Sequence, residues 1–115
     1  MLAAQNTLEL LQKVAVEDLY QKLIEQLNKD FQLSNLSENF ELSNTPIQLK
    51  EKLSAILRNL ITNHYDDYLN FLYRVDVPEQ ELLAIKSDNS NDIVAQITYL
   101  ILKREYQKVW FKNKF

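Results

Sequence analysis

The absence of glycine constrains this chain more than any other feature of its sequence. None of its 115 residues is glycine. Tight β-hairpins, phosphate-binding loops and dinucleotide-binding turns need backbone conformations that glycine adopts without steric cost. P-loops, Rossmann fingerprints and nucleophile elbows are excluded because each of these motifs contains glycine. Helix interiors need none, so the sequence favours an all-α fold. At the helix C-termini, where glycine is usual, we expect either that asparagine takes its place or that the ends fray.

The length and composition agree with one small globular domain. Hydrophobic residues make up 46% of the chain and charged residues 25%, which are ordinary values for a folded domain. We therefore expect a single helical domain over residues 1–115. Cysteine is absent, which excludes disulfides, thiolate zinc sites and cysteine nucleophiles and fits a reducing compartment.

Neither end of the chain suggests export or membrane insertion. The N-terminal segment MLAAQN has no basic region and no long apolar run, so we expect no signal peptide. The longest uninterrupted apolar stretch, from Tyr99 to Leu102, is far shorter than a membrane span. We expect a soluble cytoplasmic protein that makes no contact with a membrane.

Apolar residues three and four positions apart predict a first helix over residues 7–30. Asn6 is a candidate N-cap, and Glu9 follows it at the capping-box position. Residues 32–44 are rich in serine and asparagine, and we expect a polar loop there, pinned by a few apolar anchors. The candidate anchors are Leu33, Leu36, Phe40 and Leu42.

The second helix has the clearest start signal in the chain. Thr45 is the expected N-cap, Pro46 stands at the first helical position, and Gln48 completes a capping box. An apolar stripe then continues to about Arg74, and the sequence leaves open a break at Asn63 and His64.

Proline ends the second helix, because Val77 precedes Pro78 and the residue before proline avoids the α region. We expect a short helix over residues 79–86, a polar turn over 87–91 and a last helix over 92–112. Together these segments predict a small antiparallel helical bundle of three long helices and one short helix.

Residues 64–67 (HYDD) are the one cluster with catalytic-looking side chains. A metal site needs further ligands at helical spacing, and a serine triad needs a nucleophile in a recognisable context. The chain has a single histidine, His64, so we expect a solvent-exposed turn, no metal, no cofactor and no enzymatic activity. A cleft lined by His64, Tyr65 and Tyr68 stays open as an alternative, because tyrosine buries its ring while keeping its hydroxyl near water.

Arg74 alternates with apolar residues at the expected end of the second helix. Its guanidinium group could bind an anion, since the planar fork of donors matches carboxylates and phosphates. We favour a structural role, an ion pair that fixes the turn, with Asp66, Asp67 or Asp76 as its partner.

The C-terminal segment differs in charge from the rest of the chain. Residues 98–115 carry a formal charge of +4, against −7 for residues 1–97. Basic and aromatic side chains interleave there, a combination that suits phosphate contacts with base stacking and also a membrane-surface helix. Cations near a helix C-terminus are equally explained by the helix dipole. With Arg74, the candidate partner or anion surface comprises Lys103, Arg104, Lys108, Trp110 and Phe111.

Two segments carry a resemblance to known sequences. Residues 65–79 (YDDYLNFLYRVDVPE) and 101–112 (ILKREYQKVWFK) resemble small all-helical proteins of Bacteroidetes-type bacteria that have no assigned function. The resemblance implies a bacterial, cytoplasmic, helical domain. It carries no site residue over to this chain, because the family has no known activity.

Three hypotheses for the function follow. We favour a non-enzymatic helical interaction module that binds a protein partner or a second copy of itself, because every familiar catalytic motif is missing. The first alternative is nucleic-acid binding through the basic aromatic C-terminal helix. The second is a small-molecule-binding or catalytic bundle around the face from Tyr65 to Arg74.

Overall fold

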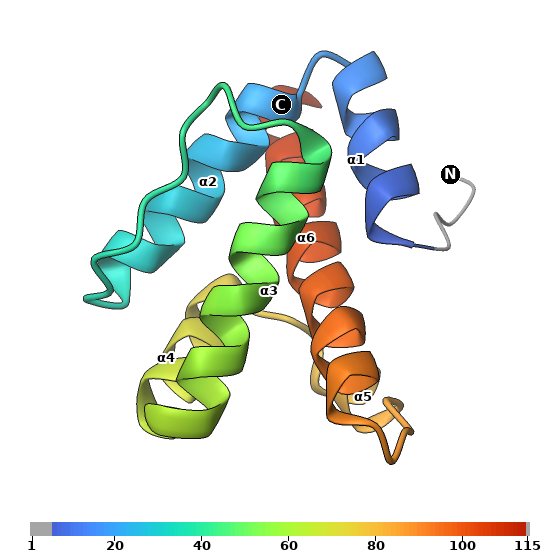
Figure 1. Cartoon of the computed structure of the whole chain (residues 1–115). Helices are drawn as coiled ribbons and strands as arrows, with labels where there is room; N and C mark the ends of the chain where they lie inside the picture. The colour runs from blue at the N-terminus through green and yellow to red at the C-terminus, as the bar shows by residue number, and fades with distance from the viewer. Residues whose placement is uncertain (1–5, 115) are drawn as a thin grey trace.

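Helices provide the regular structure of residues 6–114, the part of the chain that the computed structural model describes (Figure 1). No strand occurs among these residues, which confirms the all-α class. No helix in this part is both long enough and apolar enough to cross a membrane. The elements in chain order are α1 (Thr7–Val16), α2 (Tyr20–Leu33), α3 (Pro46–Asn63), α4 (Tyr65–Val75), α5 (Glu79–Leu83) and α6 (Ser90–Lys114).

The predicted helix over residues 7–30 is wrong, because a corner at Asp18 divides it into α1 and α2. The backbone of Asp18 adopts the left-handed conformation with φ of 60°. Its N–H donates to the carbonyl of Ala15, and the Leu19 N–H donates to that of Val14, each at 3.0 Å. These two bonds form a Schellman motif, which ends a helix. Leu19, the first residue after the corner, is buried. The apolar stripe of α1 therefore continues into α2.

The start of α3 is confirmed in full. The Thr45 side chain accepts a hydrogen bond from the Gln48 N–H at 3.2 Å, and the Gln48 side chain accepts one from the Thr45 N–H at 2.9 Å. Pro46 occupies the first helical position. The second predicted helix is nevertheless two helices, because the chain breaks at His64, where φ is −143° and ψ is 58°. The second of them, α4, ends at Val75, one residue beyond the expected end.

The remaining boundaries shift by a few residues. The short helix α5 ends at Leu83 and not at residue 86. The last helix begins at Ser90, where the Asn89 side chain accepts hydrogen bonds from the N–H groups of Asn91 and Asp92. Residues 6–114 therefore contain six helices, where the sequence pattern predicted three long helices and one short one.

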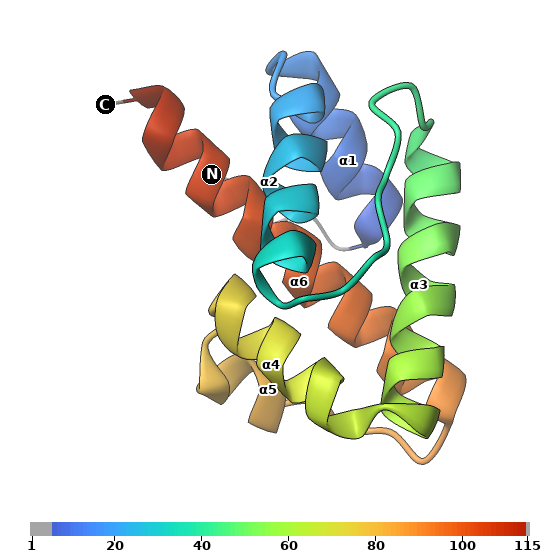
Figure 2. The same ribbon diagram turned by 90° about the vertical axis from the view of Figure 1, so that its left-hand side faces the viewer.

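The longest helix, α6, forms the centre of the packing. It contacts each of the five other helices, and its inward face includes Ile97, Ile101 and Leu102, all buried. α4 starts at the lower end of α3, and its C-terminal end reaches the second half of α6, where the Val75 carbonyl lies 3.4 Å from Lys108 Nζ (Figures 1 and 2). The last turns of α6 extend beyond the other helices (Figures 1 and 2). Between α2 and α4 the Phe31 and Phe71 rings stack with centroids 4.1 Å apart. The core thus runs from the α1–α2 corner down to α4.

The connection from α2 to α3 is long but anchored. Phe40 is 1% exposed, and its backbone N–H and C=O are both bonded to the Asn28 side chain, at 2.7 and 2.8 Å. This is the polar loop with apolar anchors that the sequence predicted, although Leu33 and Leu42 remain largely exposed.

Candidate functional site at the C-terminal helix

Three of the five basic residues of α6 are engaged in ion pairs within the molecule. Lys103 Nζ lies 2.8 Å from Glu81 Oε1 of α5. The Arg104 guanidinium group lies 3.3 Å from Asp76 Oδ2 and donates to the Asp76 backbone carbonyl at 3.0 Å. The predicted anion surface is therefore largely neutralised at these two positions.

Lys108 points into the protein, where it joins three helices. Its Nζ atom lies 2.5 Å from Asp30 Oδ2 of α2, 3.0 Å from Glu105 Oε1 and 3.4 Å from the Val75 carbonyl of α4. The exposed fractions of the Lys108, Asp30 and Glu105 side chains are 18%, 3% and 0%. Gln26 completes this buried charge cluster by donating from Nε2 to Asp30 Oδ1 at 3.2 Å. Lys108 is thus an internal counter-charge and not a surface cation.

Glu105 is the unusual member of the buried charge cluster. Neither carboxyl oxygen forms a regular hydrogen bond with a described residue, although Lys108 Nζ lies 3.0 Å from Oε1. Burial raises the pKa of Glu105 well above its ordinary value, and the neighbouring Asp30 carboxylate raises it further, while Lys108 opposes both effects. Glu105 therefore keeps its proton at a pH where an exposed glutamate has lost it. The two carboxyl groups of the cluster are thus buried, and Lys108 is its most exposed charged member.

An apolar surface lies on the outer side of the same helix. We call it the C-terminal aromatic surface and define it by the lining of a shallow depression: Tyr106, Gln107, Trp110 and Phe111. Phe111 is 54% exposed, and its ring meets the half-buried Trp110 edge-on, with centroids 5.3 Å apart. The C-terminal end of α6 is thus only partly docked, because Val109 is buried whereas Phe111 faces solvent.

Hydrogen bonds to the first two helices hold the C-terminal aromatic surface in place. The Tyr106 hydroxyl donates to Glu17 Oε1 at 2.7 Å. Burial, and then this hydrogen bond, raise the pKa of Tyr106 to about 12, so the hydroxyl keeps its proton and the bond persists. On the other side of α6, Lys112 Nζ donates to Gln26 Oε1 of α2 at 2.6 Å. The aromatic side chains therefore stand on a fixed helix.

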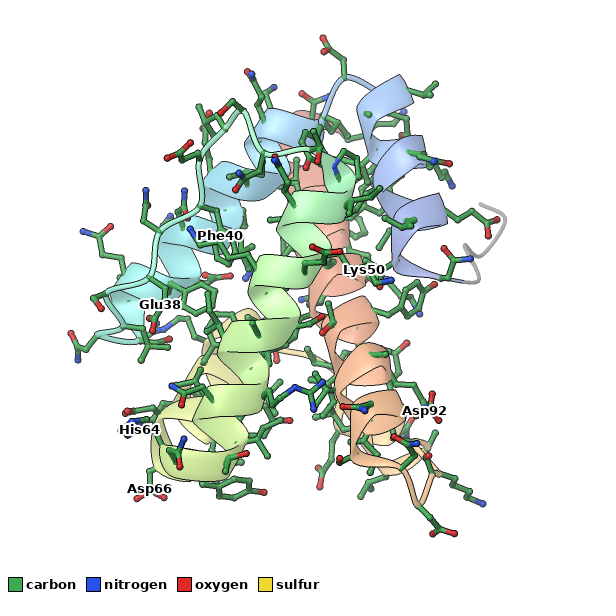
Figure 3. The ribbon with its side chains drawn as sticks, in the orientation of Figure 1. Glu38, Phe40, Lys50, His64, Asp66 and Asp92 are labelled. Carbon is green, nitrogen blue, oxygen red and sulfur yellow. The ribbon has the colours of Figure 1, made fainter. Side chains whose placement is uncertain are left out.

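The structure places the residues of the predicted cleft, His64, Tyr65 and Tyr68, in different surroundings. His64 lies on the surface (Figure 3). Tyr65 is also exposed, while Tyr68 is 6% exposed and belongs to the core. The ring centroids of the two tyrosines lie 5.6 Å apart. Within the described residues no three His, Asp or Glu side chains gather as metal ligands.

The predicted ion pair of Arg74 is also wrong. Arg74 is exposed on α4 and has no carboxylate partner among the described residues. Asp76, one of its expected partners, pairs with Arg104 of α6. Asp76 turns toward α6 because its backbone is left-handed, with φ of 70°, at the end of α4.

Comparisons of the chain with protein-family models, with curated proteins and with solved structures give no match. The resemblance of residues 65–79 and 101–112 to bacterial helical proteins therefore stays a prediction. We infer the function from the chain's own residues alone.

Proposed function

We propose that this chain is a non-enzymatic helical module that binds a protein partner through the C-terminal aromatic surface. The supporting observation is the pairing of the 54% exposed Phe111 with Trp110 on a helix that ion pairs and hydrogen bonds fix to the body. Aromatic side chains are enriched at the centres of protein interfaces, where they supply much of the binding energy. The end of α6 that carries them extends beyond the other helices, which leaves it accessible (Figure 2).

The charge distribution around α6 weakens the nucleic-acid alternative. Phosphate contacts need free cations, but Lys103, Arg104 and Lys108 each lie within ion-pair distance of a carboxylate. A small-molecule or catalytic role around α4 has less support still, because Tyr68 is buried away from His64. We keep a bacterial cytoplasm as the proposed compartment, on the strength of the sequence resemblance.

The test compares the chain with two variants as bait in a lysate of bacteria. Phe111→Asp places a charge in the centre of the C-terminal aromatic surface, while Leu83→Asp makes the same change at a 72% exposed residue of α5. Because both sites are exposed, we expect stability changes of only about 0.5 kcal/mol. A partner should be retained by the chain and by Leu83→Asp, and lost with Phe111→Asp.

The purified partner is then titrated onto the chain. Trp110 is the only tryptophan of the chain, so after subtraction of the partner's own emission the signal reports on this surface and should shift to the blue as water is excluded. Equal capture by both variants, or an emission that does not respond to the partner, would refute this binding surface.

A further inference from the structure

The outward face of α4 carries two parallel columns of exposed side chains. Residues four positions apart lie above one another on a helix. The apolar column, with exposed fractions of 55%, 44% and 87%, consists of Tyr65, Leu69 and Tyr73. Beside it, all exposed, runs a polar column of Asp66, Asn70 and Arg74. Asp66 points away from the body of the protein (Figure 3).

The charges of the polar column lack ion-pair partners in the part of the chain that the structure describes. Neither Asp66 nor Arg74 forms an ion pair with another described residue, in contrast to the paired cations of α6. Their placement in the first and last turns suits the dipole of α4. The dipole does not explain why Tyr73, a large ring, is 87% exposed beside them. An outside partner would account for both columns at once.

We infer that this face of α4 binds the same face of a second copy of the chain, with the two helices antiparallel. A two-fold axis through the middle of α4 makes both columns complementary to themselves. Leu69 then meets the partner's Leu69, and Tyr65 meets the partner's Tyr73. In the second column Asp66 faces the partner's Arg74, and the two ion pairs formed are related by the axis. Such a patch, which matches its own copy, is what an isologous dimer requires.

Two further features favour a second copy as the occupant. Asn70 lies at the middle of the polar column, and its amide can both donate to and accept from the partner's Asn70 across the axis. Antiparallel helices also place opposite dipole ends side by side. A partner with a different sequence would need no such symmetry of charge about Asn70.

The exposed area sets the strength of the association. From the exposed fractions, the three apolar side chains of both copies together would bury roughly 700 Å², and the polar column brings the total to about 1,000 Å². This is the lower end of the range for specific interfaces. We therefore expect a transient dimer that forms at high protein concentration and not a permanent one.

Charge reversal tests the register of the two helices. Asp66→Arg and Arg74→Asp each place like charges opposite one another across the axis, so each variant alone should associate at least about 10-fold more weakly than the natural chain. The two variants are complementary to each other, and an equimolar mixture should recover the association as a heterodimer. Sedimentation equilibrium up to about 1 mM chain, the weak limit of measurable affinity, gives the dissociation constants.

Matched controls separate this interface from general charge effects and from the proposed partner surface. Lys86→Asp and Asp88→Arg make similar charge changes at exposed residues of the α5–α6 turn and should leave the association unchanged. Phe111→Asp should also leave it unchanged, so a failure here is distinct from a failure of the proposed function. Tyr73→Glu, at an 87% exposed site that the fold does not need, should abolish the dimer. Circular dichroism confirms that each variant is folded.

Two results would overturn the inference. One is a natural chain that stays monomeric at about 1 mM. The other is a mixture of Asp66→Arg and Arg74→Asp that associates no better than its components, since the antiparallel register requires them to pair.

Discussion

Two buried carboxyl groups share one lysine at the centre of this molecule. Removing a charge from water is costly unless a partner compensates it. Lys108 compensates one negative charge, that of Asp30, whose Oδ2 atom lies 2.5 Å from Lys108 Nζ. The Asp30 carboxylate also accepts a hydrogen bond from Gln26. Glu105, at 0% exposure and without a hydrogen-bond donor among the described residues, is therefore the group that stays protonated.

The protonation of Glu105 gives a pH dependence with a definite sign. The pKa of Glu105 in the folded state is raised well above the ordinary 4.5. The contribution of Glu105 to the free energy of unfolding is therefore complete below the ordinary pKa. The contribution is lost as the pH rises toward the folded pKa. Glu105→Gln keeps the shape and removes the titration. The stability of the variant relative to the natural chain should rise with pH above about 5, by up to about 1.4 kcal/mol per pH unit.

Urea unfolding of both chains from pH 4 to pH 8 measures the difference. Parallel stability curves would show that Glu105 ionises in the folded state as it does in the unfolded one.

Removal of Lys108 tests the same cluster from the other side. Lys108→Met leaves the buried Asp30 carboxylate without a counter-charge, and we expect a loss of about 3–5 kcal/mol in the free energy of unfolding. Asp30→Asn in the same chain should recover part of this loss. The matched control is Lys103→Met, whose pair with Glu81 is about a third exposed, so it should cost less than about 1 kcal/mol. Similar losses for the two lysine variants would contradict a buried counter-charge.

At the scale of the elements, helix ends are shaped by the lack of glycine. Asp18, Asn35 and Asp76 have positive φ angles of 60°, 60° and 70°, and each follows the last residue of a helix or lies close to it. Asparagine and aspartate tolerate this conformation better than other residues with a side chain. The prediction that asparagine would replace glycine holds at Asn35, and aspartate performs the same role at the two other positions.

The corner at Asp18 provides a test of this role. Asp18→Gly should raise the free energy of unfolding by as much as about 1 kcal/mol, because glycine adopts a positive φ without steric cost. Asp18→Val should lower it by about 1–2 kcal/mol, since a β-branched residue is poorly suited to this conformation. The control is Asp92→Gly, in the first turn of α6, which should cost about 1 kcal/mol. The midpoints of urea unfolding rank the stabilities of the three variants. An Asp18→Val variant more stable than the natural chain would contradict the role of Asp18 at this corner.

Local features of the fold could be predicted from the sequence, and non-local ones could not. The capping box of Thr45 and Gln48 involves neighbours three residues apart, so the sequence alone is sufficient. The corner at Asp18 was not predicted from the sequence, because the apolar stripe runs through it without interruption. Glu105 has a signal that was missed: it lies four residues from Ile101 and from Val109, both buried, so helical periodicity places it inward.

Periodicity and capping patterns cannot predict which residues pair with those of the candidate site. Lys108 meets Asp30, which is 78 residues earlier, and Arg104 meets Asp76, 28 residues earlier. Which of the many carboxylates a lysine meets depends on how the helices pack, and spacing along the chain carries no information about it. The basic aromatic C-terminal segment was therefore identified correctly as a sequence feature, while the state of its charges was not.

At the scale of the whole molecule, folding cancels the charge asymmetry of the sequence. The basic residues of the segment with a formal charge of +4 lie on α6, between Lys103 and Lys114. The packing brings acidic residues from three other places against them. Each acidic residue forms an ion pair with one cation of α6; the three are Asp30 of α2, Asp76 after α4 and Glu81 of α5. Of the two remaining lysines, Lys112 donates to Gln26, and Lys114 lies 5.3 Å above the Trp110 ring. The surface of α6 is thus much less basic than its sequence.

This cancellation predicts that the chain does not bind polyanions. The net charge of −3 repels them at long range, so the chain should pass a heparin column without retention at about 0.1 M salt, where screening acts within roughly 10 Å. The double variant Asp76→Asn/Glu81→Gln releases the two cations that these carboxylates hold and should be retained longer. Asp88→Asn/Glu51→Gln makes the same change in net charge at exposed residues outside any described ion pair and should elute with the natural chain. Retention of the natural chain with a steep dependence on salt would show that the cations of α6 are free in solution. Nucleic-acid binding would then replace protein binding as the proposed function, because the ion pairs of α6 are the observation that speaks against it.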